Sequence, residues 1–323
     1  MSILSRRKVL ALGAAGASLA LLPPWALAQD RLDLVATTGM IADAVRQVGG
    51  DAVAVRGLMG SGVDPHTYRQ TRSDIVAMTR ADAVFWHGLY LEAQLEEFLG
   101  QLAANTKVFP LAESVPVELR LAHDTYKDRF DPHVWMAPEL WTHVVGAARD
   151  ALSSLVPAQA GMFTANAETH LAQIIALNDY ARAVLATVPA EHRVLVTAHD
   201  AFKYFGRAFD FEVVGIQGIS TESEAGLRRI EDIVAMLVER QIGAIFVESS
   251  VSARNVEALI EGAAARGHAV VIGGSLYSDA MGAPDSYEGT YIGMIDHNVT
   301  LVTRALSGQA PQTGLNGKLS GVA

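Results

Sequence analysis

The chain has 323 residues, half of them hydrophobic, which is enough for two domains with cores of their own. A formal net charge of −10 makes nucleic acid and anionic lipid poor partners and suits a protein that meets cations. The absence of cysteine excludes disulfides, thiolate metal sites, a cysteine nucleophile and lipid attachment through a cysteine after a signal.

Residues 1–28 are predicted to be an export signal. The pair Arg6-Arg7 precedes a modestly apolar run that ends in Ala26-Leu27-Ala28, small residues typical of a cleavage site. The run is too short for a membrane span, so a twin-arginine signal is favoured over an ordinary secretory signal and over a retained anchor. Cleavage would remove three basic and no acidic residues, shift the charge from −10 to −13, and leave a protein free in the periplasm.

Residues 29–156 are expected to form an N-terminal α/β lobe. Short apolar runs alternate with amphipathic ones, which indicates βα units and a largely parallel sheet. Strands are expected at 32–37, 53–59, 83–86 and 107–110, and helices at 39–48, 73–79, 91–102 and 138–155. Loops at 60–66 and 113–132 separate them, and each carries the triplet Asp-Pro-His.

A single long helix is predicted at 157–188. Pro157 suits a first helical turn, and Pro189 closes the run. Apolar residues recur between them at steps of three and four. A helix of that length spans about 46 Å, which favours a helix that links two lobes over one that packs on a single lobe.

Residues 189–307 repeat the alternation and are expected to form a C-terminal α/β lobe. Strands are predicted at 194–197, 212–216, 244–247 and 269–272, and helices at 201–208, 224–240, 253–266 and 291–306. Residues 308–323 have no periodicity and are expected to be a flexible tail.

Four residues stand out as candidate metal ligands: His66, His133, His199 and Asp279. Three of them follow a predicted strand, and ligands of open α/β sheets bind beyond the carboxyl ends of the strands. Three imidazoles and one carboxylate make a complete shell for a tetrahedral divalent ion. From spacing alone, four unrelated surface residues explain the pattern equally well.

The two Asp-Pro-His triplets give a physical reason to favour the metal site. Pro65 and Pro132 fix their own φ and restrict the residue before them, so each following histidine stands on a stiff loop. Nearby carboxylates could accept a ring N–H from a ligand histidine. The candidates are Asp64, Asp131, Asp200 and Glu248. The remaining seven histidines are interpreted as structural or surface residues.

These motifs resemble the metal-binding, TroA-type class of ABC-transporter solute-binding proteins. The resemblance rests on the stretches 62–66, 131–135, 197–202, 218–224 and 276–279 and covers the mature chain. It implies two βα lobes joined by one long rigid helix, with one ion in the cleft between them. It also implies His66, His133, His199 and Asp279 as the ligands, and a monomer that hands its ion to a membrane permease without being an enzyme.

Zinc and manganese remain open. Zinc-scavenging members of this class usually carry a His-rich loop before the second ligand, where this chain has only His123. Manganese-dedicated members commonly have glutamate in place of His199. Three nitrogens favour zinc by raw affinity, whereas a bidentate Asp279 would favour manganese.

Two other classes stay open: a zinc-dependent hydrolase, and a haem- or siderophore-binding protein of the same architecture. A hydrolase needs an open coordination position and a base, and the chain has no His-Glu-x-x-His helix. A haem or siderophore site needs a wide apolar cleft rather than converging imidazoles.

Overall fold

The short apolar runs of the first half form one parallel sheet in the computed structural model, which describes residues 31–320. The predicted export signal therefore lies outside the described residues. The sheet has the order β2-β1-β3-β4. Its strands are β1 (Leu32–Ala36), β2 (Val53–Gly57), β3 (Ala83–Trp86) and β4 (Lys107–Pro110). Because every pairing is parallel, all four strands end at the same edge.

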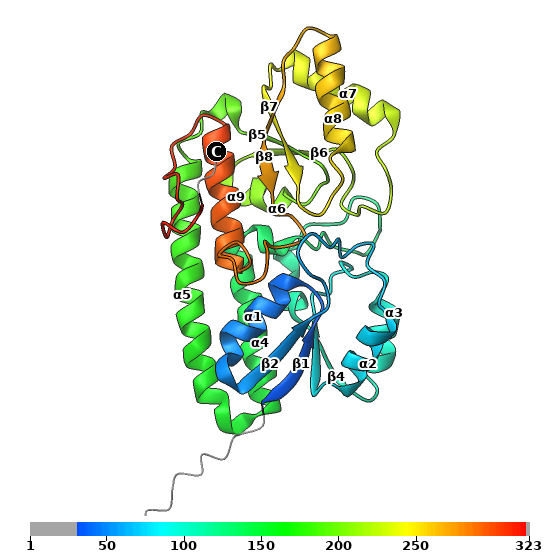
Figure 1. Cartoon of the computed structure of the whole chain (residues 1–323), viewed down its shortest axis with the longest axis vertical. Helices are drawn as coiled ribbons and strands as arrows, with labels where there is room; N and C mark the ends of the chain where they lie inside the picture. Colours follow the sequence, from blue (N-terminus) through cyan, green and yellow to red (C-terminus); the bar gives the residue numbers. More distant parts are fainter. Residues whose placement is uncertain (1–30, 321–323) are drawn as a thin grey trace, which may run out of the picture. The chain divides into compact units, whose positions relative to one another are not determined.

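Local sequence signals mark the start of three of the four helices of this half. The helices are α1 (Gly39–Gly49), α2 (Arg72–Arg80), α3 (Glu96–Leu102) and α4 (Pro138–Leu155) (Figure 1). The Thr38 hydroxyl accepts the Ile41 N–H at the start of α1, and Thr71 with Asp74 forms a capping box on α2. Pro138 occupies the first turn of α4, where its missing N–H costs nothing.

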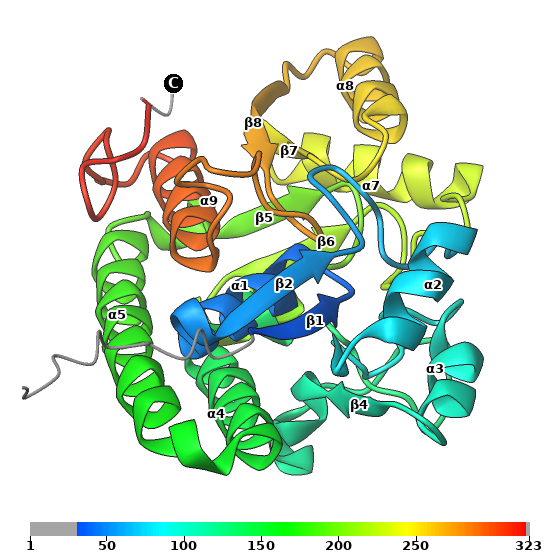
Figure 2. The same cartoon turned by 60° about the horizontal axis from the view of Figure 1, so that its bottom comes forward.

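The second half builds two parallel strand pairs, β5-β6 and β7-β8, with β7 in contact with β5. The strands are β5 (Val194–Thr197), β6 (Glu212–Gly215), β7 (Ala244–Glu248) and β8 (Val271–Leu276). The helices are α6 (Lys203–Phe209), α7 (Leu227–Glu239), α8 (Arg254–Ala265) and α9 (Tyr291–Ala305). Figure 2 shows α7 and α8 on one side of these strands and α9 on the other.

The long helix α5 (Ala160–Leu185) connects the halves and packs against elements of both. It touches α1 and α4 of the first half and α6 and α9 of the second (Figure 1). Its 26 residues span about 39 Å. The predicted helix at 157–188 is therefore slightly too long, because Pro157–Gln159 forms a separate 3₁₀ turn and the chain leaves the helix before Pro189.

Of three buried hydrophobic clusters in the described residues, one runs through both halves. Its buried members include residues of α1 and α4, the inner face of α5, and α9. From Leu32 onward the chain forms one compact unit. The division into lobes at 29–156 and 189–307 accordingly stays a prediction. Within residues 31–320, no helix is both long enough and apolar enough to cross a membrane.

Two predicted elements are displaced for identifiable reasons. The helix expected at 91–102 starts only at Glu96, because residues 89–95 form turns that begin with Gly88, Leu89 and Tyr90 at positive φ. The strand expected at 269–272 runs instead from Val271 to Leu276 and contains two glycines. A Cβ on Gly273 would lie 2.8 Å from the Phe246 ring, and Gly274 has φ of +143° against Leu301, so both positions need glycine.

The tail is anchored rather than loose over 308–320. The Leu315 N–H donates to the carboxylate of Asp296 on α9, at 2.9 Å to Oδ1, and Leu319 is buried against the core. Gly314, with φ of +70°, passes so close to Asp296 that a side chain would collide with it. A buried carboxylate on α9 thus organises a segment whose composition predicts no structure.

Candidate metal centre

Four side chains from four loops meet in the interior: His66, His133, His199 and Asp279. One donor atom of each lies within 4.8 Å of the others, and all four residues are buried. His66 follows β2, His199 follows β5 and Asp279 follows β8, while His133 stands just before α4. The structure therefore brings together the four residues that the sequence singles out.

The donor atoms face one another at separations suited to a single ion. The His66 and His133 Nε2 atoms are 3.3 Å apart, and Nε2 of His133 lies 3.4 Å from Oδ1 of Asp279. Nε2 of His199 lies 3.1 Å from Oδ2 of Asp279. In a tetrahedral shell with bonds of about 2.0–2.1 Å, neighbouring donors are roughly 3.3 Å apart.

Within residues 31–320, three of these atoms have no hydrogen-bond partner outside the cluster: Nε2 of His199 and both carboxylate oxygens of Asp279. A buried polar atom without a partner costs about 1–3 kcal/mol. These three atoms lie together beside the Nε2 atoms of His66 and His133, and a bound cation would give all of them a partner. The residues therefore fit a divalent metal ion.

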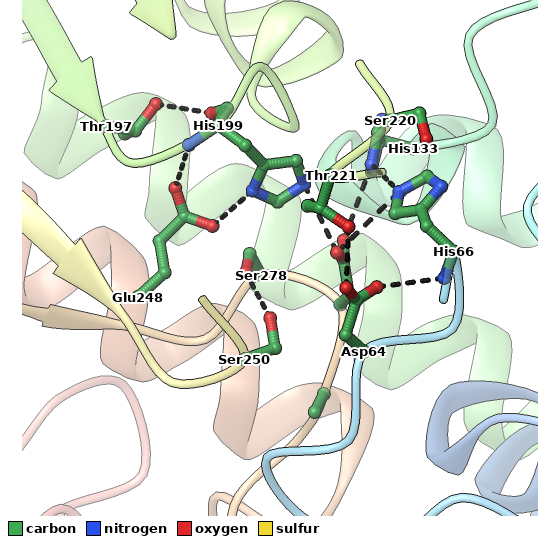
Figure 3. A network of polar contacts seen from close by, with 12 residues as sticks. Asp64, His66, His133, Thr197, His199, Ser220, Thr221, Glu248, Ser250 and Ser278 are labelled. Atoms are coloured by element: carbon green, nitrogen blue, oxygen red, sulfur yellow. Dashed lines mark hydrogen bonds and ion pairs between the residues drawn. The ribbon is translucent and has the colours of Figure 1, made fainter. Parts of the chain in front are cut away.

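Two of the three imidazoles are held by a buried carboxylate at their other ring nitrogen. Asp131 Oδ1 accepts from the backbone N–H of His133 at 3.0 Å and contacts its Nδ1 at 2.7 Å. Glu248 at the end of β7 does the same for His199, at 2.8 Å and 2.5 Å (Figure 3). Both carboxylates were candidates from the sequence. Each contacts Nδ1 of its histidine, so that Nε2 of the same ring faces the cluster.

The other two candidate carboxylates behave differently. Asp64 accepts the backbone N–H of His66 at 2.8 Å and does not touch its ring. Asp64 also accepts a hydrogen bond from the hydroxyl of Thr221, a residue of the second half, at 2.5 Å (Figure 3). Asp200 follows His199 directly, but its carboxylate pairs with Lys203 at 2.9 Å rather than with a histidine ring of the cluster.

The electrostatics of the cluster separate one neutral imidazole from two charged ones. Burial lowers the pKa of His66 to about 3 and outweighs the charge of Asp279. Burial would also lower the pKa of His133, but the charges and hydrogen bonds of Asp131 and Asp279 raise it to about 9. Against the same burial effect, the charges of Asp279 and Glu248 hold the pKa of His199 well above its usual value.

Asp279 is the counter-charge to these imidazoles. Burial would raise the pKa of its carboxyl, yet the charges of His199 and His133 and their hydrogen bonds hold that pKa well below its usual range. Without metal, the cluster is therefore an ion-paired group that stores protons on the same nitrogens a metal would use.

Comparison with known proteins identifies the family. A family model described as "Zinc-uptake complex component A periplasmic" matches residues 34–305. The chain belongs to this family. Its members are substrate-binding components of transporters, as the names of its relatives state.

Two relatives of nearly equal similarity carry different metals in their names. The zinc-binding protein TroA of Treponema pallidum is 44% identical over 281 residues, which cover 87% of this chain and 91% of TroA. The manganese-binding lipoprotein MntA of Bacillus subtilis is 43% identical over 279 residues, covering 86% and 91%. The solved structure of the periplasmic zinc-binding protein TroA from Treponema pallidum matches 85% of this chain and 99% of its own, with a TM-score of 0.83 and 43% identity.

Hydrogen bonds across the two halves tie the ligand-bearing loops together. The Trp135 indole N–H donates to the Ser278 carbonyl at 2.9 Å, directly before Asp279. Tyr204 of α6 donates to the carbonyl of Asp131 at 2.9 Å. Trp135 was predicted to be a core residue and is fully buried. Its link to Ser278 and the role of Tyr204 carry no signal in the sequence, because both partners lie far away along the chain.

The remaining histidines stay outside the cluster. His87 is fully buried, and its Nε2 lies 2.7 Å from the carbonyl of Pro132, so it supports the loop that carries His133. His268 similarly contacts the carbonyl of Ile242 at 2.7 Å. Among residues 31–320, the four-residue cluster is the one group of His, Asp and Glu side chains spaced to hold a metal ion.

Proposed function

We propose that this protein captures a divalent transition-metal ion, Zn²⁺ or Mn²⁺, and delivers it to an ABC permease for import. The observation that carries the proposal is the buried convergence of three Nε2 atoms and one carboxylate, with three of the donor atoms lacking any other partner. The ion is cargo: the family's members are named for zinc uptake or for binding a metal.

In this proposal His66, His133, His199 and Asp279 are the ligands. Each half of the chain supplies two of them, so the ion joins the halves. Four protein ligands close a tetrahedral shell and leave no position for a water or a substrate, which argues against catalysis. The alternatives, a zinc hydrolase or a haem or siderophore binder, receive no support from the family, and the buried cluster offers neither an open position nor a wide cleft.

The choice between the two metals depends on the donor set. Three imidazoles favour Zn²⁺, which also ranks above Mn²⁺ in the general affinity order. Both oxygens of Asp279 face the cluster, and bidentate binding through them would suit Mn²⁺. We infer from the three nitrogens that Zn²⁺ binds more tightly and that Mn²⁺ binds measurably.

Location and assembly complete the proposal. The family description places its members in the periplasm. We propose that a twin-arginine signal at residues 1–28 exports this chain and is cleaved, so that the mature monomer begins near Gln29. The Arg6-Arg7 pair and the lack of cysteine support this route over a lipid-anchored one.

The test is elemental analysis of protein taken from its native compartment, followed by calorimetric titration with Zn²⁺ and Mn²⁺. Asp279→Asn keeps the side-chain shape and removes the only negative charge among the ligands. This substitution should lower the affinity for both metals more than 100-fold. The loss is larger than the roughly 10–100-fold that is typical when a residue hydrogen-bonded to a ligand is changed. Asp210→Asn, at a carboxylate that is 95% exposed, is the matched control and should bind like the wild type. Wild-type affinity in Asp279→Asn would refute the ligand assignment.

A further inference from the structure

Glu248 makes two hydrogen bonds to a single residue, His199. Its side chain is fully buried at the end of β7. Oε1 accepts the backbone N–H of His199 at 2.8 Å, and Oε2 lies 2.5 Å from Nδ1 of the ring. The Thr197 hydroxyl donates to the His199 carbonyl at 2.8 Å, so the backbone of His199 is held on both sides (Figure 3).

This geometry fixes which ring nitrogen faces the metal. A backbone N–H can only donate, and a buried carboxylate can accept from both the backbone and the ring. Nδ1 of His199 therefore keeps a proton, and Nε2 is the nitrogen left to bind a metal once its own proton has been displaced. Nε2 has no hydrogen-bond partner outside the cluster, as a ligand atom should.

We propose that Glu248 is a positioning residue that biases the site towards zinc over manganese; this inference rests on the proposed function. A carboxylate behind a ligand imidazole strengthens the donor nitrogen. A stronger nitrogen donor benefits zinc more than manganese, which prefers oxygen ligands. Glu248 also disfavours an acidic ligand at position 199, because a carboxylate there would face the buried Glu248 carboxylate.

The three imidazoles of the site are supported unequally. Asp131 also contacts both the backbone N–H and the ring Nδ1 of His133, but through the single oxygen Oδ1. Asp64 contacts only the backbone of His66, and the one carboxylate near the His66 ring, that of Asp279, lies 3.7 Å from Nε2 on the side of the cluster. Glu248 and Asp131 are therefore the two groups through which the protein tunes its nitrogen donors, and Glu248 is the one contributed by the second half.

The test compares Glu248→Gln with Asp200→Asn in the full mature protein. In the present geometry Oε1 and Oε2 of Glu248 each meet one nitrogen of His199, and an amide replaces one of these two oxygens by an NH₂ donor, so one of the two hydrogen bonds is lost. Glu248→Gln should lower zinc affinity about 10–100-fold and manganese affinity less, so that the zinc-to-manganese affinity ratio falls. Asp200→Asn removes a negative charge next to His199 without touching a ring, and should keep the wild-type ratio.

A spectroscopic readout separates positioning from a general structural role. In ¹⁵N NMR of the zinc-loaded wild type, His199 should show a protonated Nδ1, assigned by its absence from His199→Ala. This measurement does not depend on the folding of the Glu248 variant. In Glu248→Gln, the Nδ1–H signal should shift or vanish while the thermal unfolding of the metal-free protein stays cooperative.

The possible outcomes are distinguishable. If the wild type binds neither metal, the proposed function fails. If the wild type binds both but Glu248→Gln keeps the wild-type ratio, or if zinc-loaded His199 lacks a proton on Nδ1, the proposed function stands and the inference about Glu248 is overturned. A fall in the ratio for Asp200→Asn equal to that for Glu248→Gln would also overturn it, because charge alone would then explain the effect.

Discussion

Protons and metal ions compete for the same nitrogen atoms of His133 and His199. With a pKa of about 9, His133 is protonated at pH 7 in the metal-free protein, and the pKa of His199 is likewise raised. His66, with a pKa of about 3, is neutral and offers no competition. In the proposed ligand assignment, a metal must therefore displace protons from two of its three imidazole ligands.

We predict that metal affinity rises as the pH increases from 6 to about 9, and that binding at pH 7 releases protons. The sign follows because only the deprotonated nitrogen binds metal, and the raised pKa values extend proton competition above the ordinary imidazole value of about 6.5. Calorimetry in buffers of different ionisation enthalpy counts the protons. Affinity that is flat above pH 7, or binding enthalpies that do not depend on the buffer, would contradict this charge assignment.

At the residue scale, the sequence predicts the cluster better than its supports. The prolines of the two Asp-Pro-His triplets indicate stiff loops, and the structure adds that Asp64 and Asp131 accept the N–H two residues on. The contact of Glu248 with His199 spans 49 positions, so no local pattern specifies it. Asp200 is adjacent in sequence to His199, yet its carboxylate pairs with Lys203. Adjacency along the chain therefore does not predict the partner of a side chain.

At the element scale, α5 derives its stability from packing on both halves rather than from its own sequence. Leu177 on its inner face is fully buried, whereas Ile175, two residues earlier, is 56% exposed. We predict that Leu177→Ala lowers the free energy of unfolding by about 2–5 kcal/mol, because it leaves a cavity in the shared core. Ile175→Ala is the matched control on the same helix and should change it by less than about 0.5 kcal/mol.

Urea denaturation of the metal-free protein measures both variants. If the two variants lost equal amounts of unfolding free energy, helix propensity rather than burial would determine the stability of α5. The periodic stripe predicts which face of α5 is buried, with Ile174, Leu177 and Ala181 all fully enclosed. The displaced elements are those where backbone geometry overrides composition: the positive-φ turn at residues 88–90 and the two glycines inside β8.

At the scale of the whole molecule, α5 is an uninterrupted connection between the two halves. Residues 162–188 contain neither glycine nor proline, and α5 contacts both halves along a common core. We predict nearly the same radius of gyration for the metal-free and metal-loaded protein, with release of the ion through local loop motion. Small-angle X-ray scattering measures the radius of gyration of both forms. A clear compaction on metal binding would show that a hinge exists.

Overall architecture followed from the sequence because strand–helix alternation and one uninterrupted helical stripe are long, repeated signals. The shared core did not follow, because it depends on which faces of α1, α4, α5 and α9 meet in space. The anchoring of residues 308–320 was missed for the same reason, since Asp296 reaches that segment from another element.

The indole of Trp135 lies between two ligand-bearing loops, with its ring centroid 5.1 Å from that of His133 and its N–H on the carbonyl of Ser278. An imidazolium this close to an excited indole draws electron density from it and dims its emission. Exchange of the His133 proton for an ion changes the field at that ring. We therefore expect metal binding to change the fluorescence of Trp135, so that binding can be followed without an attached dye.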